Sequence, residues 1–223
     1  MDIKRLFAFL RELETNNNTM WMGAHRQEYN ELREQFFPMV QTITDRMAAY
    51  DNSLAGVEAK DCIYRINRNL RFSPDKRPYK NFFSAYMVRG GRHCYRSGYY
   101  LHLQPGEAFL ASGLYSPTPE MLRAIRSEID YNGDRLVELL GDKRLKGAFA
   151  MDGERLKTTP KGYPADHKHI ELLRMKNFGF TRNYSDKVIE NMPCEKLVDA
   201  IVENFAIVVP VAKFFNEALS DVL

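Results

Sequence analysis

A block of short β-type runs in the middle of the chain constrains the fold more than any other feature. Strand-forming residues fill four runs, at 62–72, 82–88, 98–104 and 107–115. Gly90-Gly91 follows the second run and Pro105-Gly106 separates the last two. Such pairs are typical of tight turns between antiparallel strands, so the block predicts a mainly antiparallel sheet.

Helical periodicity dominates both ends of the sequence. Apolar spacing predicts helices over 2–14, from 19 through a kink at Pro38 towards 50, from 119, over 134–140 and over 194–223, with a kink at Pro210. Thr118 suits the N-cap of the third helix and Pro119 its first position. Residues 141–166 read as mostly loop with one short strand, 169–175 as helical and 178–182 as extended. We therefore predict one α+β domain over 1–223, with N- and C-terminal helices packed on a central antiparallel sheet.

Length and composition are ordinary for a globular protein. The 223 residues are 44% hydrophobic, enough for a core without disulfide or metal support. No apolar run approaches the roughly 20 residues that span a bilayer, and the start is too charged for a signal peptide. Cys62, Cys94 and Cys194 are sparse and unpaired in spacing, which predicts packing roles and a cytoplasmic location without membrane contact.

Positive charge gathers in one segment. The net charge is +3, but residues 60–100 hold ten Lys/Arg and two Asp/Glu, a net of +8, which leaves −5 elsewhere. This asymmetry predicts a surface that attracts anions. Pairing of the extra arginines with acids of the same chain is the alternative explanation.

The cations concentrate in residues 65–80. If this stretch is a strand, alternation places Arg65 and Arg71 on one face with two amides, while Arg68 lies on the other. Arginine forks suit phosphate or carboxylate, and Lys76 and Lys80 add point charges. Two more residues of the stretch are candidates for chemistry. Asp75, held between two prolines, could orient an arginine or act as a general base, and Tyr79 adds a hydroxyl and an aromatic face. An internal ion-pair cluster that pins the turn to the sheet explains the same residues without a ligand.

The stretch also resembles the signature of an uncharacterised family of bacterial and fungal proteins, Arg-x-x-Arg-Asp-x-Arg-Phe-x-x-Asp/Asn-Lys-x-x-Tyr. Here it runs from Arg65 to Tyr79, with Asn69 in place of the Asp. An amide cannot serve as a base, so a mechanism that needs a carboxylate there is in doubt. Further similarities lie at 16–18 with Trp21, at 98–102, at 160–163 and at 166–167. The resemblance implies a site in this stretch and no known activity.

Other candidates carry less specific signals. His102 lies on the polar side of its run and could act as an acid or base, although a histidine satisfied by a neighbouring backbone group is the favoured explanation. Lys161, before a glycine, could approach a phosphate. Asp166, His167 and His169 lack further ligands at metal-site spacing, so we predict no metal. No cofactor motif is present, which predicts no cofactor.

Three functions remain open from the sequence. The first is binding of a small anionic, phosphate-bearing ligand through the cluster of Arg65, Arg68, Arg71, Lys76 and Lys80, with Tyr79 and Lys161 nearby. The second is an enzyme acting on a phosphoester or nucleic acid, with Asp75, His102 or Tyr79 as acid or base. The third is nucleic-acid binding without catalysis, with Tyr79, Tyr95, Tyr99 and Tyr100 as stacking platforms. The sequence does not decide between binding and catalysis, and it carries no signal for the oligomeric state.

Overall fold

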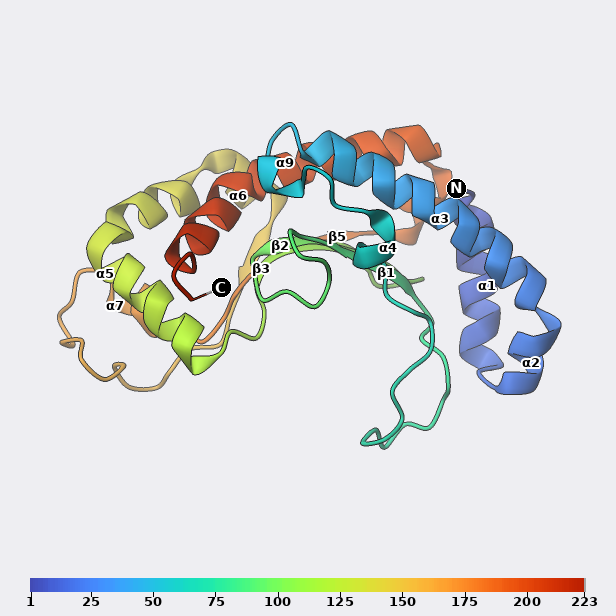
Figure 1. Ribbon diagram of the computed structural model, residues 1–223, viewed down its shortest axis with the longest axis horizontal. Coiled ribbons are helices and arrows are strands. Elements are labelled where there is room, and N and C mark those ends of the chain that lie inside the picture. The colour runs from blue at the N-terminus through green and yellow to red at the C-terminus, as the bar shows by residue number, and fades with distance from the viewer. Residues whose placement is uncertain (223) are drawn as a thin grey trace.

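Residues 1–222, the part of the chain that the computed structural model describes, form nine α-helices, one 3-10 helix and a five-stranded sheet (Figure 1). The α-helices are α1 (Ile3–Thr15), α2 (Thr19–Ala24), α3 (Arg26–Met47), α4 (Ala59–Cys62), α5 (Pro119–Gly141), α6 (Lys143–Ala148), α7 (Ile170–Leu173), α8 (Asp186–Asn191) and α9 (Cys194–Ala218); the 3-10 helix is η1 (Asn52–Leu54). The strands are β1 (Phe83–Met87), β2 (Gly98–Leu103), β3 (Ala108–Leu114), β4 (Ala150–Asp152) and β5 (Phe178–Tyr184). Leu223, the last residue of the predicted C-terminal helix, lies outside the described residues.

The sheet has the order β1-β2-β3-β5-β4, and every neighbouring pair is antiparallel. The first three strands form a meander through the predicted glycine and proline turns. β5 then returns from far along the chain and lies between β3 and β4. The predicted α+β class with a central antiparallel sheet is confirmed.

Helices cover one face of this sheet. Strand residues that point towards α3 and α9 are large and apolar, and their rings pack on rings of those helices. Phe36 of α3 contacts Phe83 at 5.4 Å between ring centres, and Tyr99 contacts Phe205 of α9 at 5.4 Å. In Figure 1, α3 and α9 lie above the sheet, α1 and α2 at one end, and α5 to α7 at the other. The predicted packing of N- and C-terminal helices on the sheet is thus confirmed.

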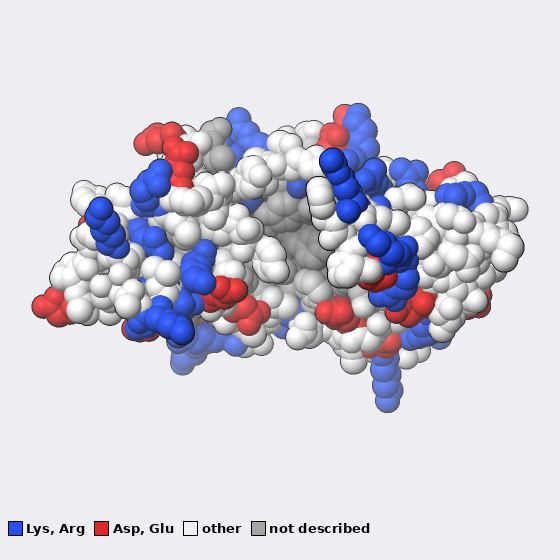
Figure 2. Space-filling view, turned by 90° about the horizontal axis from the view of Figure 1, so that it is seen from below, with Lys and Arg blue, Asp and Glu red and all other residues white. Residues whose placement is uncertain are grey.

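The opposite face of the sheet, which we call the open face, carries small, polar and aromatic side chains. Its residues are Ser84, Tyr86, Tyr100, His102, Phe109, Ala111, Gly113, Gly179, Thr181 and Asn183, as strand alternation and register require. Figure 2 looks onto this side of the molecule and shows a hollow in the middle, with Lys and Arg side chains on either side.

Several local predictions are corrected. Residues 62–72 do not form a regular strand: only isolated bridges, Ile63 to Ala85 and Asn67 to Tyr79, replace the predicted pairing. The segment 141–166 is less irregular than predicted, since it contains α6 as well as the short strand β4. The two helices predicted after 119 are halves of α5, which has non-helical backbone at Asn132. Pro38 and Pro210 lie inside α3 and α9, and the kinks at these prolines stay predictions.

The buried apolar side chains form one cluster that joins residues from α1 through α9. One domain over 1–223 stays a prediction that this continuous core supports. Among residues 1–222, no helix has both the length and the apolar character needed to cross a bilayer.

Candidate functional site

The signature residues lie on an arm, residues 64–80, that projects from the sheet edge beyond β1 (Figure 1). Its two limbs are joined by sparse backbone bonds, from Arg68 N to the Pro78 carbonyl at 2.9 Å and from Lys80 N to the Ile66 carbonyl at 2.8 Å. Pro74 and Pro78 have no N–H to donate, which limits the pairing. The arm is therefore an irregular hairpin rather than a strand of the sheet.

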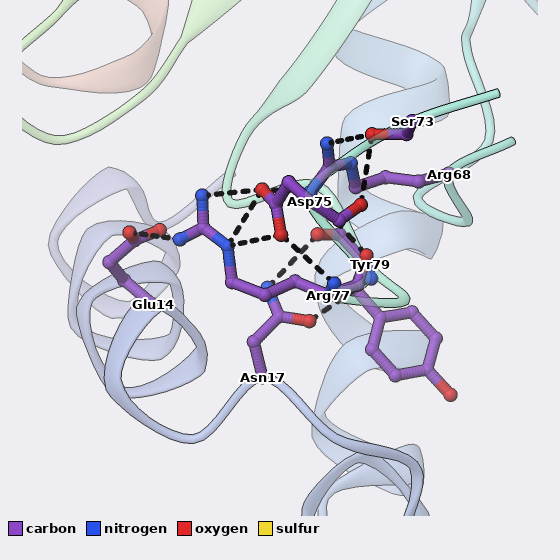
Figure 3. A network of polar contacts seen from close by, with 7 residues as sticks. All are labelled: Glu14, Asn17, Arg68, Ser73, Asp75, Arg77 and Tyr79. Atoms are coloured by element: carbon purple, nitrogen blue, oxygen red, sulfur yellow. Dashed lines mark hydrogen bonds and ion pairs between the residues drawn. The ribbon is translucent and has the colours of Figure 1, made fainter. Parts of the chain in front are cut away.

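A network at the arm pairs two of its six Lys and Arg side chains, Arg68 and Arg77, with carboxylates (Figure 3). Asp75 accepts from both Arg68 and Arg77, and the Nε–Oδ2 distance to Arg77 is 3.0 Å. Arg77 also reaches Glu14 of α1 at 2.5 Å, and Arg68 donates to the Ser73 hydroxyl at 3.3 Å. These guanidinium groups already have carboxylate partners, as the alternative explanation of the signature required.

The electrostatics of Asp75 follow from this network. Side-chain and backbone hydrogen bonds from Arg77, and then the bond from Arg68, hold the Asp75 pKa well below its usual range. Such a carboxylate stays ionised at neutral pH and is a poor proton acceptor. Asp75 therefore stabilises the arm through its ion pairs, and its geometry does not support the predicted role as a general base.

Asn17 fastens the arm to the N-terminal helices. Its side chain accepts from Tyr79 N at 3.0 Å and donates to the Tyr79 carbonyl at 2.9 Å, as a neighbouring strand would. Tyr79 itself is buried, with 6% of its surface exposed, so its ring is not a ligand platform. These contacts fix the second limb of the arm where it enters β1.

Lys80 differs from the cations farther out on the arm. Its Nζ lies 5.2 Å from the ring centre of Tyr64 and 5.6 Å from that of Phe82. Partial burial, and then the nearby charges of Arg65 and Arg92, lower the Lys80 pKa. Within residues 1–222, none of these three cations lies within ion-pair distance of a carboxylate. Lys80, Arg65 and Arg92 form what we call the cation group.

The open face holds a cavity of about 750 Å³ next to the cation group. Arg92 belongs to its wall, and so does Tyr64, over whose ring Lys80 Nζ lies at 5.2 Å. Other wall residues come from the loop 88–97, from the segment after β3 and from the strands themselves. Rings dominate the lining: Tyr64, Tyr86, Tyr95, Tyr100, Phe109 and Tyr115. A cavity of this volume, mostly apolar with a few charged groups, is typical of a small-molecule site.

Glycine keeps the floor of the cavity open. Gly113 and Gly179 are partners in the β3–β5 register, and both line the cavity. The backbone requires glycine at position 113, since φ there is +113° and a Cβ would lie 2.0 Å from the Phe178 carbonyl oxygen. Gly179 has neither constraint: a Cβ there would meet only Asp152, at 3.5 Å. A strand glycine without a packing reason suits close approach of a ligand.

A chain of side-chain hydrogen bonds runs along β2 into the cavity. The Tyr100 hydroxyl is 2.9 Å from His102 Nδ1, His102 Nε2 is 3.0 Å from Gln104 Oε1, and Gln104 donates to Glu107 at 3.1 Å. Because Gln104 presents its oxygen, His102 carries a proton on Nε2, and Nδ1 accepts from Tyr100. Phe82 and Phe109 flank the imidazole at 4.3 and 4.6 Å, and burial lowers the His102 pKa despite Gln104 and Glu107.

The remaining predicted residues do not converge with these. Arg71 lies over the exposed Phe72 ring at 5.1 Å, and Lys76 donates to the Leu70 carbonyl at 3.3 Å. Lys161 is exposed in the connection between β4 and α7, at the end of the molecule opposite to the arm (Figure 1). Of the predicted ligand residues, Lys80 lies over the ring of the wall residue Tyr64, and Arg65 is near enough to lower the Lys80 pKa.

The tyrosines proposed as stacking platforms do not form an exposed row. Tyr79 and Tyr99 are buried, and Tyr100 is half-buried in the cavity. Tyr95 alone of the four is exposed, at 58%. The nucleic-acid alternative thus loses the observation that motivated it. In residues 1–222, no group of three or more His, Cys, Asp or Glu is arranged to hold a metal ion.

Sequence reasoning named Tyr100 only as a stacking platform for nucleic acid, and it missed Arg92 and Gly179 as site residues. The alternation of Tyr100 with His102 was a usable signal for placing Tyr100 in the site, because both residues had to face the same side of β2. Gly179 carried no signal, since its role depends on a register with Gly113 that the sequence does not display.

Comparison with known families matches residues 5–214 to the DUF2461 model, described as a conserved hypothetical protein. The chain belongs to the DUF2461 family. Searches of curated proteins and of solved structures find no match. Family membership therefore leaves the function to be argued from the cavity and the arm.

Proposed function

We propose that the protein binds a small anionic, phosphate-bearing ligand in the cavity of the open face, with the cation group at one side. The observation that carries the proposal is Lys80, which is partly buried over two rings and, in residues 1–222, has no carboxylate partner. Burying an ammonium without an anion is costly, and a bound oxyanion removes that cost.

The proposal changes the site predicted from the sequence. Arg68 contributes to the arm network, whereas Lys80 and Arg65 keep their place as ligand residues and Arg92 joins them. The cavity rings contribute an apolar lining, which suits a ligand with a planar or hydrocarbon body beside its phosphate. The three free cysteines support a reducing, cytoplasmic location, which we also propose.

Titration with inorganic phosphate, sulfate and nucleotides, followed by calorimetry, tests the proposal. Lys80→Met should weaken binding of the tightest compound at least about tenfold, because a charge-assisted bond contributes about 1.5–3 kcal/mol. Lys76→Met is the matched control, since Lys76 is an exposed signature lysine that touches only a carbonyl. We expect its effect to stay within about twofold. Equal losses in both variants, or no binding of any of these compounds, would contradict the proposal.

A phosphoester-processing enzyme is the second candidate, and the hydrogen bond between Tyr100 and His102 in the cavity favours it. Asp75 and Tyr79 take no part in this version, because both are engaged in holding the arm.

A further inference from the structure

Tyr100 and His102 have the geometry of a nucleophile and its base. The phenol donates to the imidazole Nδ1 at 2.9 Å, and the imidazole is held by a third group, since its Nε2–H donates to Gln104 at 3.0 Å. Glu107 in turn fixes the amide of Gln104. A hydroxyl, a base and an orienting partner in series are the recurring arrangement of covalent catalysis.

The surroundings suit this role. Phe82 and Phe109 clamp the imidazole, which prevents it from turning away from the phenol. Tyr64 packs edge to face on Tyr100 at 6.3 Å between ring centres, and Lys80 lies over the Tyr64 ring, so one ring separates Lys80 from the Tyr100 ring. Arg92 and Arg96 line the same cavity as Tyr100. Cations beside a nucleophile stabilise the negative charge that develops on a transferring phosphoryl group.

The pKa directions of the pair define its resting state, in which the proton stays on the phenol, and both directions oppose transfer of that proton in the free protein. Burial raises the Tyr100 pKa, although a hydrogen bond with Ser84 acts against it, so the phenol keeps its proton at rest. Burial lowers the His102 pKa, so the imidazole is neutral and able to accept at pH 7. Attack by Tyr100 therefore requires His102 as proton acceptor.

We propose that Tyr100 is a catalytic nucleophile of the cavity and that His102 accepts its proton during group transfer from a phosphoester. Tyr100 Oη forms a bond to phosphorus as the ester O–P bond breaks, and the phenol proton moves to His102 Nδ1. The departing alkoxide takes a proton from water. Water then attacks phosphorus and the bond to Tyr100 Oη breaks. The attacking water passes one proton to the hydroxide left by the first step, and His102 Nδ1 returns its proton to the Tyr100 phenolate. Gln104 and Glu107 are positioning residues. The phosphoester class rests on the proposed function.

Labelling with phenylmethanesulfonyl fluoride tests the pair without a known substrate. This aromatic electrophile forms a sulfonate ester with an activated phenol, with loss of fluoride and of the phenol proton. Peptide mass spectrometry then measures the rate at each tyrosine of the full chain. Tyr50 and Tyr131 serve as internal controls, because they are 50% and 87% exposed, do not line the cavity and make no bond to an imidazole within residues 1–222.

We expect Tyr100 to be labelled at least about tenfold faster than either control, in line with the usual contribution of a positioned base. His102→Gln should slow Tyr100 at least about tenfold and leave Tyr131 unchanged. Gln104→Leu, at a half-buried position next to the exposed end of the series, provides a second variant should the first fail to fold. It should also slow Tyr100, because the imidazole loses the partner that keeps its proton on Nε2.

Two results would overturn the inference: Tyr100 labelled no faster than Tyr131, or a Tyr100 rate that His102→Gln and Gln104→Leu both leave unchanged. Failure of the anion site is distinguishable from either. In that case Lys80→Met and wild type bind phosphate compounds equally or not at all, while Tyr100 still reacts faster than the controls.

Discussion

In the arm, Arg68 and Arg77 share the carboxylate of Asp75, and Arg77 also reaches Glu14. At the edge of the open face, Lys80 lies over two aromatic rings, with no carboxylate within ion-pair distance among residues 1–222. These two regions are neighbours in sequence, and both look basic when the residues are simply counted. The difference shows that charge partners, rather than charge density, separate a structural ion-pair network from a ligand site.

The largest effect should come from the two paired glycines on the floor of the cavity. Gly113→Ala should lower the free energy of unfolding by about 1–3 kcal/mol or more, because its φ of +113° disfavours a side chain and the Cβ would meet the Phe178 carbonyl oxygen. Gly179→Ala should leave it unchanged or raise it by up to about 1 kcal/mol, since glycine weakens a strand. Urea unfolding of both variants measures the contrast.

Gly179→Leu then turns the same position into a test of the open face. The longer side chain enters the cavity, so phosphate-bearing compounds should bind at least about tenfold more weakly while the fold keeps its stability. Unchanged affinity would show that the ligand does not bind at the open face. The difference in charge pairing between the two regions would then have no bearing on ligand binding.

A smaller effect is expected where the arm is fastened to the loop between α1 and α2. Asn17→Ala removes both bonds to the Tyr79 backbone and should lower the free energy of local opening by about 1–3 kcal/mol. Hydrogen exchange of the Tyr79 and Lys80 amides should accelerate, while that of Leu101 in β2 stays slow. If Leu101 accelerates equally, the arm and the sheet open together and are one unit.

Asp75→Asn should act more weakly, and only on the arm. The folded-state pKa of Asp75 is depressed, so its stabilising effect is complete above the unfolded pKa of about 3.9 and is lost as the pH falls further. The Arg77 amide donates to Asp75 at 3.0 Å, and its NMR shift should move only below about pH 4 in the wild type. The variant should lack this titration and bind phosphate compounds like wild type. Weaker binding by Asp75→Asn would show that the arm contributes to the ligand site.

The smallest signal concerns Lys80 itself. Partial burial, together with Arg65 and Arg92, keeps its pKa below the ordinary value in the free protein. A bound oxyanion stabilises the ammonium, so the Lys80 pKa should rise when phosphate is added, as followed by carbon NMR of the lysine side chain. A pKa that does not respond to saturating phosphate would place the ligand elsewhere.

Much of the fold was predictable because its signals are local. Alternation and Gly or Pro pairs located β1, β2 and β3, and the cap on α5 formed as predicted, with Thr118 accepting from Met121 N. The arm was not predictable as an irregular hairpin, because Asn17 and Glu14 hold it from more than 60 residues away. No local pattern reports such partners.

The candidate site was predictable in part for the same reason. Lys80 and His102 were predicted as site residues from the residues next to them in the sequence, and both lie beside residues of the cavity wall. The floor could not be foreseen, since Gly179 meets Gly113 only when β5 enters the sheet between β3 and β4. Likewise Arg68 looked available for a ligand until Asp75 was seen to fold back on it.

The Asn17 contact has a consequence for the order in which the chain folds. It closes a loop of 62 residues, and the entropy of closing that loop is recovered only when the helices around Asn17 are already docked. The arm should therefore be among the last segments to become protected during refolding. The time at which the arm becomes resistant to a protease during refolding would then report when the N-terminal helices dock.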